Sequence, residues 1–383
     1  MLTENIDFKN FKIKKKTKLI KKKLNLLLKE DNQIIKSLSN NYKNSFKKKY
    51  ISKYKKFLNY RIIGMGGSIL GTQAIYDFLK HKIKKNFLFV DNLQSSNRLQ
   101  KKKIINLIVS KSGNTIETIS NANVLIKKKD YNIFITENKK SYLHLLAEKL
   151  KAEIIHHNNF IGGRYSVLSE VGMLPAELMG LNSNNFKQFN TLVKNKTFIN
   201  SLISNVASTL HFIKYKRYNS IIINYDEKSR NLFNWYQQLI AESLGKKNLG
   251  LLPIVSNMPK DNHSVMQLYL DGFKNNFYTF YYTNDERWLK INNKLILKSK
   301  SYLKNIDLGK ITLAQKQATE TIFTKKNIPF RSFLIKKRNE KTIGELFTFF
   351  ILETILLGKS LNLNPYDQPA VEQIKKETKN ILI

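Results

Sequence analysis

Short apolar strands that each run into a loop and then a helix are the feature that most constrains this fold. In the first half, such strands are predicted at 61–63, 87–90, 104–109, 133–136 and 154–155. Two of the loops stand out, a glycine loop at 64–68 and a hydroxyl-rich loop at 110–115, and helices are predicted after them over 70–79 and 115–127. This alternation is typical of βαβ units on a parallel sheet.

The second half repeats the alternation, with strands predicted at 220–224, 277–282 and 331–335 and helices at 198–215, 230–244, 311–327 and 343–357. A chain of 383 residues has the length for about two or three domains. We therefore predict an α/β protein with two domains, each a parallel sheet flanked by helices. The first domain with a connector covers 59–183, the second with C-terminal helices covers 184–383, and 1–58 form a lysine-rich helical arm.

Lysine dominates the charge, with 67 Lys and Arg against 28 Asp and Glu and a formal net charge of +39. Such an excess is typical of nucleic-acid-binding proteins. However, the lysines are spread along the chain, and aromatic residues do not alternate with them as on a base-stacking surface. Asn and Ile, whose codons are also rich in A and T, are abundant as well, so codon bias accounts for the excess. We expect no nucleic-acid partner, but we expect the charge to concentrate anionic substrates.

Composition also bounds the compartment and the chemistry. The chain has no cysteine, which excludes disulfides, thiolate metal sites and a cysteine nucleophile. No apolar run approaches the ~20 residues of a membrane span, and residues 1–10 lack the apolar segment of a secretory signal. We therefore expect a cytoplasmic location and no membrane partner. His156 and His157 have no carboxylate or histidine at metal-ligand spacing, so no metal is expected.

The two loops offer groups that bind a phosphate. In the glycine loop the backbone can approach a ligand closely, and the following helix presents free N–H groups. Ile69 stands where a dinucleotide fingerprint has its third glycine, so a tight turn is the alternative. In the second loop Ser110, Ser112 and Thr115 offer hydroxyls and Lys111 offers a charge, with a plain helix cap as the alternative.

Four residues are candidates for proton transfer and charge stabilisation. Gln238 and Glu242 are four residues apart on a predicted helix and share one face. Glu242 is flanked by apolar residues, and a carboxylate in such surroundings can act as a general base, although a surface glutamate is the alternative. His263 lies in a polar loop and could equally be an exposed or capping residue. Arg164 follows Gly162 and Gly163 in a separate loop, where it could meet a developing oxyanion or form a structural salt bridge.

Together these residues resemble the glucose-6-phosphate isomerase family, as a short bacterial-type member. The matching segments occur in order over about residues 60–376: GMGGS at 64–68, SKSGNTIET at 110–118, GGRYSVLS at 162–169, QQLIAESLGK at 237–246, His263 with Ser264 and Gln267, and YDQPAVEQIK at 366–375. The third, fourth and last of these segments are the most specific to the family. Their joint occurrence in order is what carries the resemblance.

The resemblance implies two sugar-isomerase (SIS) domains and the cofactor-free interconversion of glucose 6-phosphate and fructose 6-phosphate. Glu242 would shuttle a proton between C2 and C1 through a cis-enediolate that Arg164 stabilises, and Gln238 would lie near the sugar. His263 and Lys375 would assist ring opening, with His263 entering the site from the neighbouring subunit of a homodimer. The phosphate would be held by Gly67, Ser68, Ser110, Lys111, Ser112, Thr115 and Gln368.

Two departures from the family pattern keep alternatives open. The Ser-Gly-Asn-Thr run at 112–115 also occurs in enzymes that isomerise mannose 6-phosphate and in SIS proteins that only bind sugar phosphates. The first case would make this chain a dual isomerase. The second would make it a regulator with a DNA-binding arm within 1–58, although no glycine-containing turn joins two short helices there. Pro369 and Ala370 also depart from the family pattern, which affects the placement of Lys375.

Overall fold

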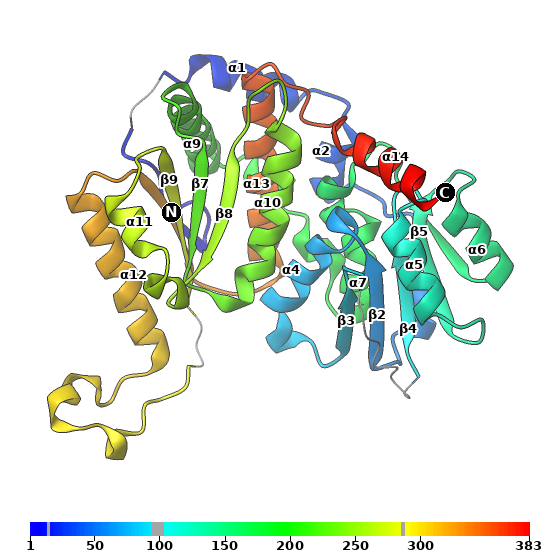
Figure 1. The fold of residues 1–383 in the computed structure, drawn as a ribbon, viewed down its shortest axis with the longest axis horizontal. Coiled ribbons are helices and arrows are strands. Elements are labelled where there is room, and N and C mark those ends of the chain that lie inside the picture. Colours follow the sequence, from blue (N-terminus) through cyan, green and yellow to red (C-terminus); the bar gives the residue numbers. More distant parts are fainter. Residues whose placement is uncertain (14–15, 94–102, 285–287) are drawn as a thin grey trace.

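The computed structural model describes residues 1–13, 16–93, 103–284 and 288–383. Figure 1 shows two α/β units beside each other, each built on a five-stranded sheet with helices packed against it. This arrangement confirms the predicted α/β class with two helix-flanked sheets.

The sheet of the first unit is wholly parallel, in the order β3-β2-β4-β5-β6. Its strands are β2 (Asn59–Gly64), β3 (Asn86–Val90), β4 (Ile105–Val109), β5 (Tyr131–Glu137) and β6 (Glu153–His157). Its helices are α4 (Leu70–Phe78), α5 (Ile116–Leu125) and α6 (Tyr142–Leu150). Every residue of β4 is buried, as expected for an apolar run in a parallel sheet that is covered on both faces.

The sheet of the second unit has the order β1-β10-β9-β7-β8, parallel except for the edge strand β1. Its strands are β1 (Ile6–Lys9), β7 (Asn219–Asn224), β8 (Leu252–Asn257), β9 (Asn276–Thr283) and β10 (Phe330–Ile335). Its helices are α9 (Lys196–Lys214), α10 (Arg230–Leu244), α11 (Met266–Asp271), α12 (Leu308–Lys325) and α13 (Glu340–Ser360). The C-terminal helix α14 (Val371–Leu382) lies on the side of the first unit in Figure 1. The side chain of Asn339 caps α13 by accepting the Thr342 N–H at 2.9 Å.

The N-terminal arm is only partly helical. It contains α1 (Lys18–Leu27), α2 (Gln33–Leu38) and α3 (Lys48–Ile51), as predicted. The helical prediction is wrong for residues 6–9, which form β1 and pair with β10 in the second unit. A distant sheet edge supplies the backbone partners there, and Ile6 is fully buried, so tertiary packing overrides the lysine-rich local sequence. Residues 14–15 of the arm lie outside the described residues.

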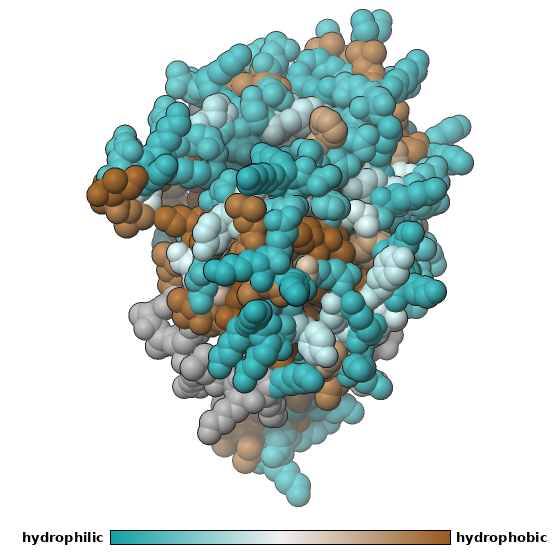
Figure 2. Space-filling model, turned by 90° about the vertical axis from the view of Figure 1, so that its right-hand side faces the viewer, coloured by the Kyte–Doolittle hydropathy of each residue, from teal (hydrophilic) through white to brown (hydrophobic). Residues whose placement is uncertain are grey.

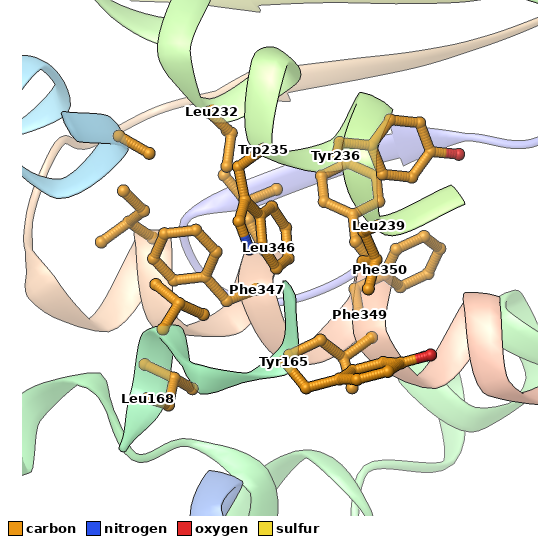
Figure 3. Close-up of a cluster of buried hydrophobic side chains, with 14 of the residues drawn as sticks. Tyr165, Leu168, Leu232, Trp235, Tyr236, Leu239, Leu346, Phe347, Phe349 and Phe350 are labelled. Atoms are coloured by element: carbon orange, nitrogen blue, oxygen red, sulfur yellow. The ribbon is translucent and has the colours of Figure 1, made fainter. Parts of the chain in front are cut away.

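The connector between the two units is part of the core. It contains the 3₁₀ helix η4 (Gly163–Leu168) and α7 (Glu170–Met179), which is buried along its whole length, and α8 (Phe189–Leu192) follows. In Figure 3 Tyr165 and Leu168 of η4 lie beneath the aromatic and aliphatic side chains of α10 and α13. Trp235 and Phe347 meet there edge to face, with 4.8 Å between ring centroids. The η4 part of the connector is thus packed against α10 and α13 of the second unit. Within the described ranges, no helix has the length and apolar character to cross a membrane.

Candidate active site

The glycine loop and the hydroxyl-rich loop leave the same edge of the first sheet. They follow β2 and β4, which are neighbours, and Gly64 pairs with Val109 at the ends of these parallel strands. Such an edge is where open α/β sheets bind ligands. Gly66 and Gly113 both have positive φ, +53° and +66°, which gives these turns their need for glycine.

The hydroxyls of the second loop are not used to cap its helix. Thr115 is the N-cap of α5 but makes no side-chain cap hydrogen bond. Its Oγ1 lies 2.9 Å from Ser110 Oγ instead, and Ser112 Oγ accepts the Asn114 N–H at 3.2 Å. Lys111 Nζ lies 3.4 Å from Glu137 Oε1, so its charge is partly paired. The plain-cap alternative therefore does not describe this loop, and its hydroxyls lie together at the sheet edge.

The glycine loop is pressed against the loop that carries Arg164. A Cβ on Gly67 would lie 2.2 Å from the carbonyl carbon of Gly163 and 2.4 Å from the Arg164 nitrogen. Only glycine fits such a backbone approach. A Cβ on Gly66 would likewise lie 2.7 Å from Gln238 Nε2. The glycine loop therefore lies directly beside two of the predicted site residues, and Gly67 has a packing role there.

Arg164 is the centre of the junction between the two units. Its guanidinium is buried, with a side chain 1% exposed, and it donates to five acceptors. These are Ser243 Oγ at 2.8 Å from Nε, Glu242 Oε2 at 3.2 Å and Gln368 Oε1 at 2.6 Å from Nη1, and the carbonyl oxygens of Pro365 at 2.8 Å and Asp367 at 3.1 Å from Nη2. A guanidinium has five N–H donors, so all of them are engaged. Arg164 thereby ties the connector to α10 and to the turn at 365–368.

Glu242 is paired on both oxygens but remains accessible. Oε2 accepts from Arg164, and Oε1 accepts from Gln238 Nε2 at 2.8 Å, which confirms that the two α10 residues share a face. The apolar surroundings predicted for Glu242 are wrong, because its apolar neighbours Leu239 and Ile240 point into the core and the carboxylate faces polar partners. The side chain is 29% exposed, so a ligand can reach it. Gln238 Oε1 is buried without a hydrogen-bond partner and can accept from a ligand hydroxyl.

The C-terminal turn and helix contribute one residue to this cluster. Gln368 reaches Arg164, and the turn is fastened by Lys246, whose Nζ lies 2.6 Å from Asp367 Oδ1 and holds the pKa of that carboxyl below its usual value. Lys375 is exposed on α14 with its Nζ 2.6 Å from Glu372 Oε1. His263 is exposed at the end of the 3₁₀ helix η7 (Lys260–His263). The structure thus joins Arg164, Gln238, Glu242 and Gln368, and places His263 and Lys375 on exposed segments.

Ser243, Pro365 and Trp235 hydrogen-bond Arg164, and the sequence did not predict them as site residues. Ser243 Oγ lies 2.8 Å from Tyr165 OH, which also donates to the Pro365 carbonyl at 2.8 Å. Trp235 Nε1 donates to the Arg164 carbonyl at 3.1 Å. A hydroxyl next to the candidate base was the only available signal for Ser243. No local pattern marks a backbone carbonyl such as that of Pro365 as an arginine acceptor.

Comparison with known proteins gives one family. The family model described as phosphoglucose isomerase matches residues 28–250. A glucose-6-phosphate isomerase of Methanocaldococcus jannaschii is 33% identical over 360 residues, and one of Campylobacter jejuni is 33% identical over 346 residues. In both cases the match covers 85% of this chain and 85% of the relative.

Two solved structures share the fold. A hypothetical protein from Thermus thermophilus superimposes with a TM-score of 0.84 at 22% identity, covering 96% of this chain and 94% of that one. A glucose-6-phosphate isomerase from Chlamydia trachomatis superimposes with a TM-score of 0.73 at 18% identity, covering 87% of this chain and 71% of that one.

Proposed function

The chain belongs to the phosphoglucose isomerase family, and we propose that it interconverts D-glucose 6-phosphate and D-fructose 6-phosphate. The observation that carries the proposal is the meeting of Glu242, Arg164 and Gln238 at the junction of the two units. An accessible carboxylate beside a buried guanidinium supplies a base and a partner for a developing anion in one place. Proton transfer next to a carbonyl group needs both.

Glu242 is the proposed base. Its carboxylate removes the proton from C2 of the open-chain aldose, the C–H electron pair forms a C1–C2 double bond, and the carbonyl oxygen on C1 takes the negative charge. A proton then passes from the oxygen on C2 to the oxygen on C1, and Glu242 returns its own proton to C1. Arg164 stabilises the charge of the cis-enediolate between the two transfers. The unpartnered Oε1 of Gln238 accepts from a sugar hydroxyl.

The full engagement of Arg164 sets a condition on substrate binding. Since all five donors are occupied, an enediolate oxygen must replace one of the present acceptors. Ser243 and Pro365 are buried, and the exposed Asp367 accepts through its backbone carbonyl. Gln368 is exposed and accepts through its side chain, so its amide is the acceptor that can leave. A released Gln368 is then free to reach the phosphate, which is the role that the resemblance implies for it.

The phosphate site follows from the two loops. Ser68, Ser110, Ser112 and Thr115 supply hydroxyls, Lys111 supplies charge, and the backbone at Gly67 completes the edge. Anchoring the phosphate orients the reacting carbons against Glu242, because binding energy remote from the reacting carbons fixes the geometry at the reacting bond. No cofactor is needed for this reaction.

Ring opening is assigned to His263 and Lys375, with His263 supplied by a second copy in a homodimer. Exposed apolar side chains support a subunit contact. Leu295, Leu297 and Tyr302, exposed by 76%, 76% and 69%, lie on a segment that Figure 1 shows projecting from the second unit. Figure 2 shows further apolar side chains gathered in the middle of a largely hydrophilic face. Large exposed apolar groups are typical of contact surfaces.

We keep 59–183 and 184–383 as the proposed SIS domains, with 1–58 as the arm. The reaction is a step of glycolysis and gluconeogenesis, so the enzyme is proposed to act in the cytoplasm.

The direct test is conversion of fructose 6-phosphate by the purified chain. Glu242→Gln is expected to lose about 10²–10⁴-fold in kcat while still binding the sugar phosphate. Glu227→Gln, at an exposed position before α10, is the matched control and is expected to keep full activity. Absence of turnover in the unaltered chain would overturn the proposal, as would undiminished turnover by Glu242→Gln.

A further inference from the structure

The loop that delivers Arg164 is also held by residues outside α10. It covers 158–163, from the end of β6 to the first residue of η4. Its last glycine presses on Gly67, and its next residue is Arg164, so its position sets both the anion partner and the glycine loop. The residues that hold this loop therefore affect the position of Arg164 relative to the substrate.

Two buried side chains fasten it. His157 closes β6, and its Nε2 lies 3.0 Å from the Ile161 carbonyl oxygen, across the loop. Glu170, at the first position of α7, accepts the Asn158 N–H on Oε1 at 2.6 Å. The side chains of His157 and Glu170 are each only 1% exposed.

The two anchors are also coupled to each other. His157 Nδ1 lies 3.4 Å from Glu170 Oε1, so both ring nitrogens face oxygen acceptors. Burial acts to raise the pKa of Glu170, but the hydrogen bond and charge of His157 together with backbone N–H groups hold it below its usual value. The second oxygen of Glu170 accepts from Tyr42 OH at 3.0 Å, which ties the pair to the N-terminal arm.

We propose that His157 and Glu170 are positioning residues for the isomerisation, holding the loop 158–163 so that Arg164 meets the enediolate. Neither side chain touches Arg164 or Glu242 in the contacts of the described residues, so their effect passes through the loop backbone. The role in turnover rests on the proposed function, whereas the role in holding the loop does not.

Helix α7 itself provides the matched control. Glu177 is a second buried carboxylate on the same helix, and its partners are Lys48 at 2.6 Å, Lys55 at 2.9 Å and Ser183 Oγ at 2.8 Å, none of which belongs to the loop. Glu170→Ala and Glu177→Ala therefore remove the same group from comparable burial. Only the first removes a loop anchor.

Kinetics separate the two roles. Glu170→Ala is expected to lower kcat by about 10–100-fold with a smaller change in KM, because displacing a catalytic group by about 1 Å can cost that much. Glu170→Gln keeps an oxygen for the Asn158 N–H and is expected to restore most of the rate. Glu177→Ala is expected to lower Tm but to leave kcat within about twofold. Equal kcat losses in the two alanine variants would overturn the proposal.

Trp235 supplies a readout that needs no activity. Its indole N–H donates to the Arg164 carbonyl, and the chain has only two tryptophans. The ¹H–¹⁵N signal of this indole is expected to shift in Glu170→Ala and to stay in place in Glu177→Ala. If the unaltered chain proves inactive, the proposed function fails. The indole signal still tests whether Glu170 holds the loop 158–163. Should Glu170→Ala not fold, His157→Leu, which removes the tie to Ile161, is expected to give the same shift, and an unmoved signal would overturn the proposal.

Discussion

The junction around Arg164 and the segments that carry His263 and Lys375 are held in opposite ways. Arg164 is buried, and each of its donors has a fixed acceptor on α10 or on the 365–368 turn. His263 and Lys375 are exposed, and Lys375 pairs with Glu372 on its own helix. The fold of one chain therefore organises the proposed base Glu242 and the proposed anion partner Arg164. The groups proposed for ring opening must approach from exposed or neighbouring surfaces, so activity and stability should depend on the two regions differently.

Arg164→Ala should show the largest effect of the junction. It removes the proposed anion partner and leaves the buried Ser243 hydroxyl and Pro365 carbonyl with Tyr165 OH but without the guanidinium donor. We expect a loss of about 10²–10³-fold in kcat together with a lower Tm. Steady-state kinetics and thermal unfolding measure both. Arg217→Ala is the control, and the guanidinium of Arg217 lies 3.5 Å from the Asn276 carbonyl oxygen. A similar loss of kcat in Arg217→Ala would show that the effect is not specific to Arg164.

Gly67→Ala tests the close backbone approach in the same region. Its Cβ would lie 2.2 Å from the Gly163 carbonyl carbon, so one loop must move. We expect about 1–3 kcal/mol of lost stability and a fall in kcat of about 10²-fold. Gly162→Ala is the contrast, because its Cβ would meet only Tyr165 Cδ2, at 3.7 Å. Equal behaviour of the two variants would show that the junction tolerates movement.

Lys375→Ala tests the exposed region. Because Lys375 and its helix are exposed, Tm is expected to stay unchanged, while turnover falls by about 10–100-fold through slower ring opening. Arg164→Ala differs, because it is expected to lower both the rate and the stability. An unchanged rate would take Lys375 out of the proposed mechanism.

Glu345 on α13 should change stability with little effect on activity. Burial raises its pKa to about 7, opposed by the hydrogen bond from Thr3 and the charge of Lys341 and supported by Glu4. The folded carboxyl keeps its proton to higher pH than the unfolded one, whose usual pKa is 4.5. Stability from this group is therefore fully present below about pH 4.5 and is lost as the pH rises through 7, on the order of 2–3 kcal/mol. Glu345→Gln should remove this dependence in denaturant unfolding across pH 4–8, and an unchanged slope would contradict it.

The sequence predicts most of the first unit because its signals are local. The apolar run 105–109 forms β4, and the four-residue spacing of Gln238 and Glu242 puts both on one face of α10. Strand β8 is missed because Pro253 and two polar residues interrupt its apolar pattern, and β1 because its partner lies more than 320 residues away. The contact between Arg164 and Gln368 spans 204 residues, so spacing cannot show it. Among the signals in the sequence, only the family resemblance points to Gln368.

The measurement that tests the central claim most directly uses glucose 6-phosphate deuterated at C2, with the unaltered chain and Glu242→Gln. If Glu242 moves the proton, the unaltered chain shows a primary isotope effect on kcat, and the deuterium appears at C1 of fructose 6-phosphate or in water. The variant binds the same substrate but moves no label. Label transfer by Glu242→Gln at the rate of the unaltered chain would contradict the account.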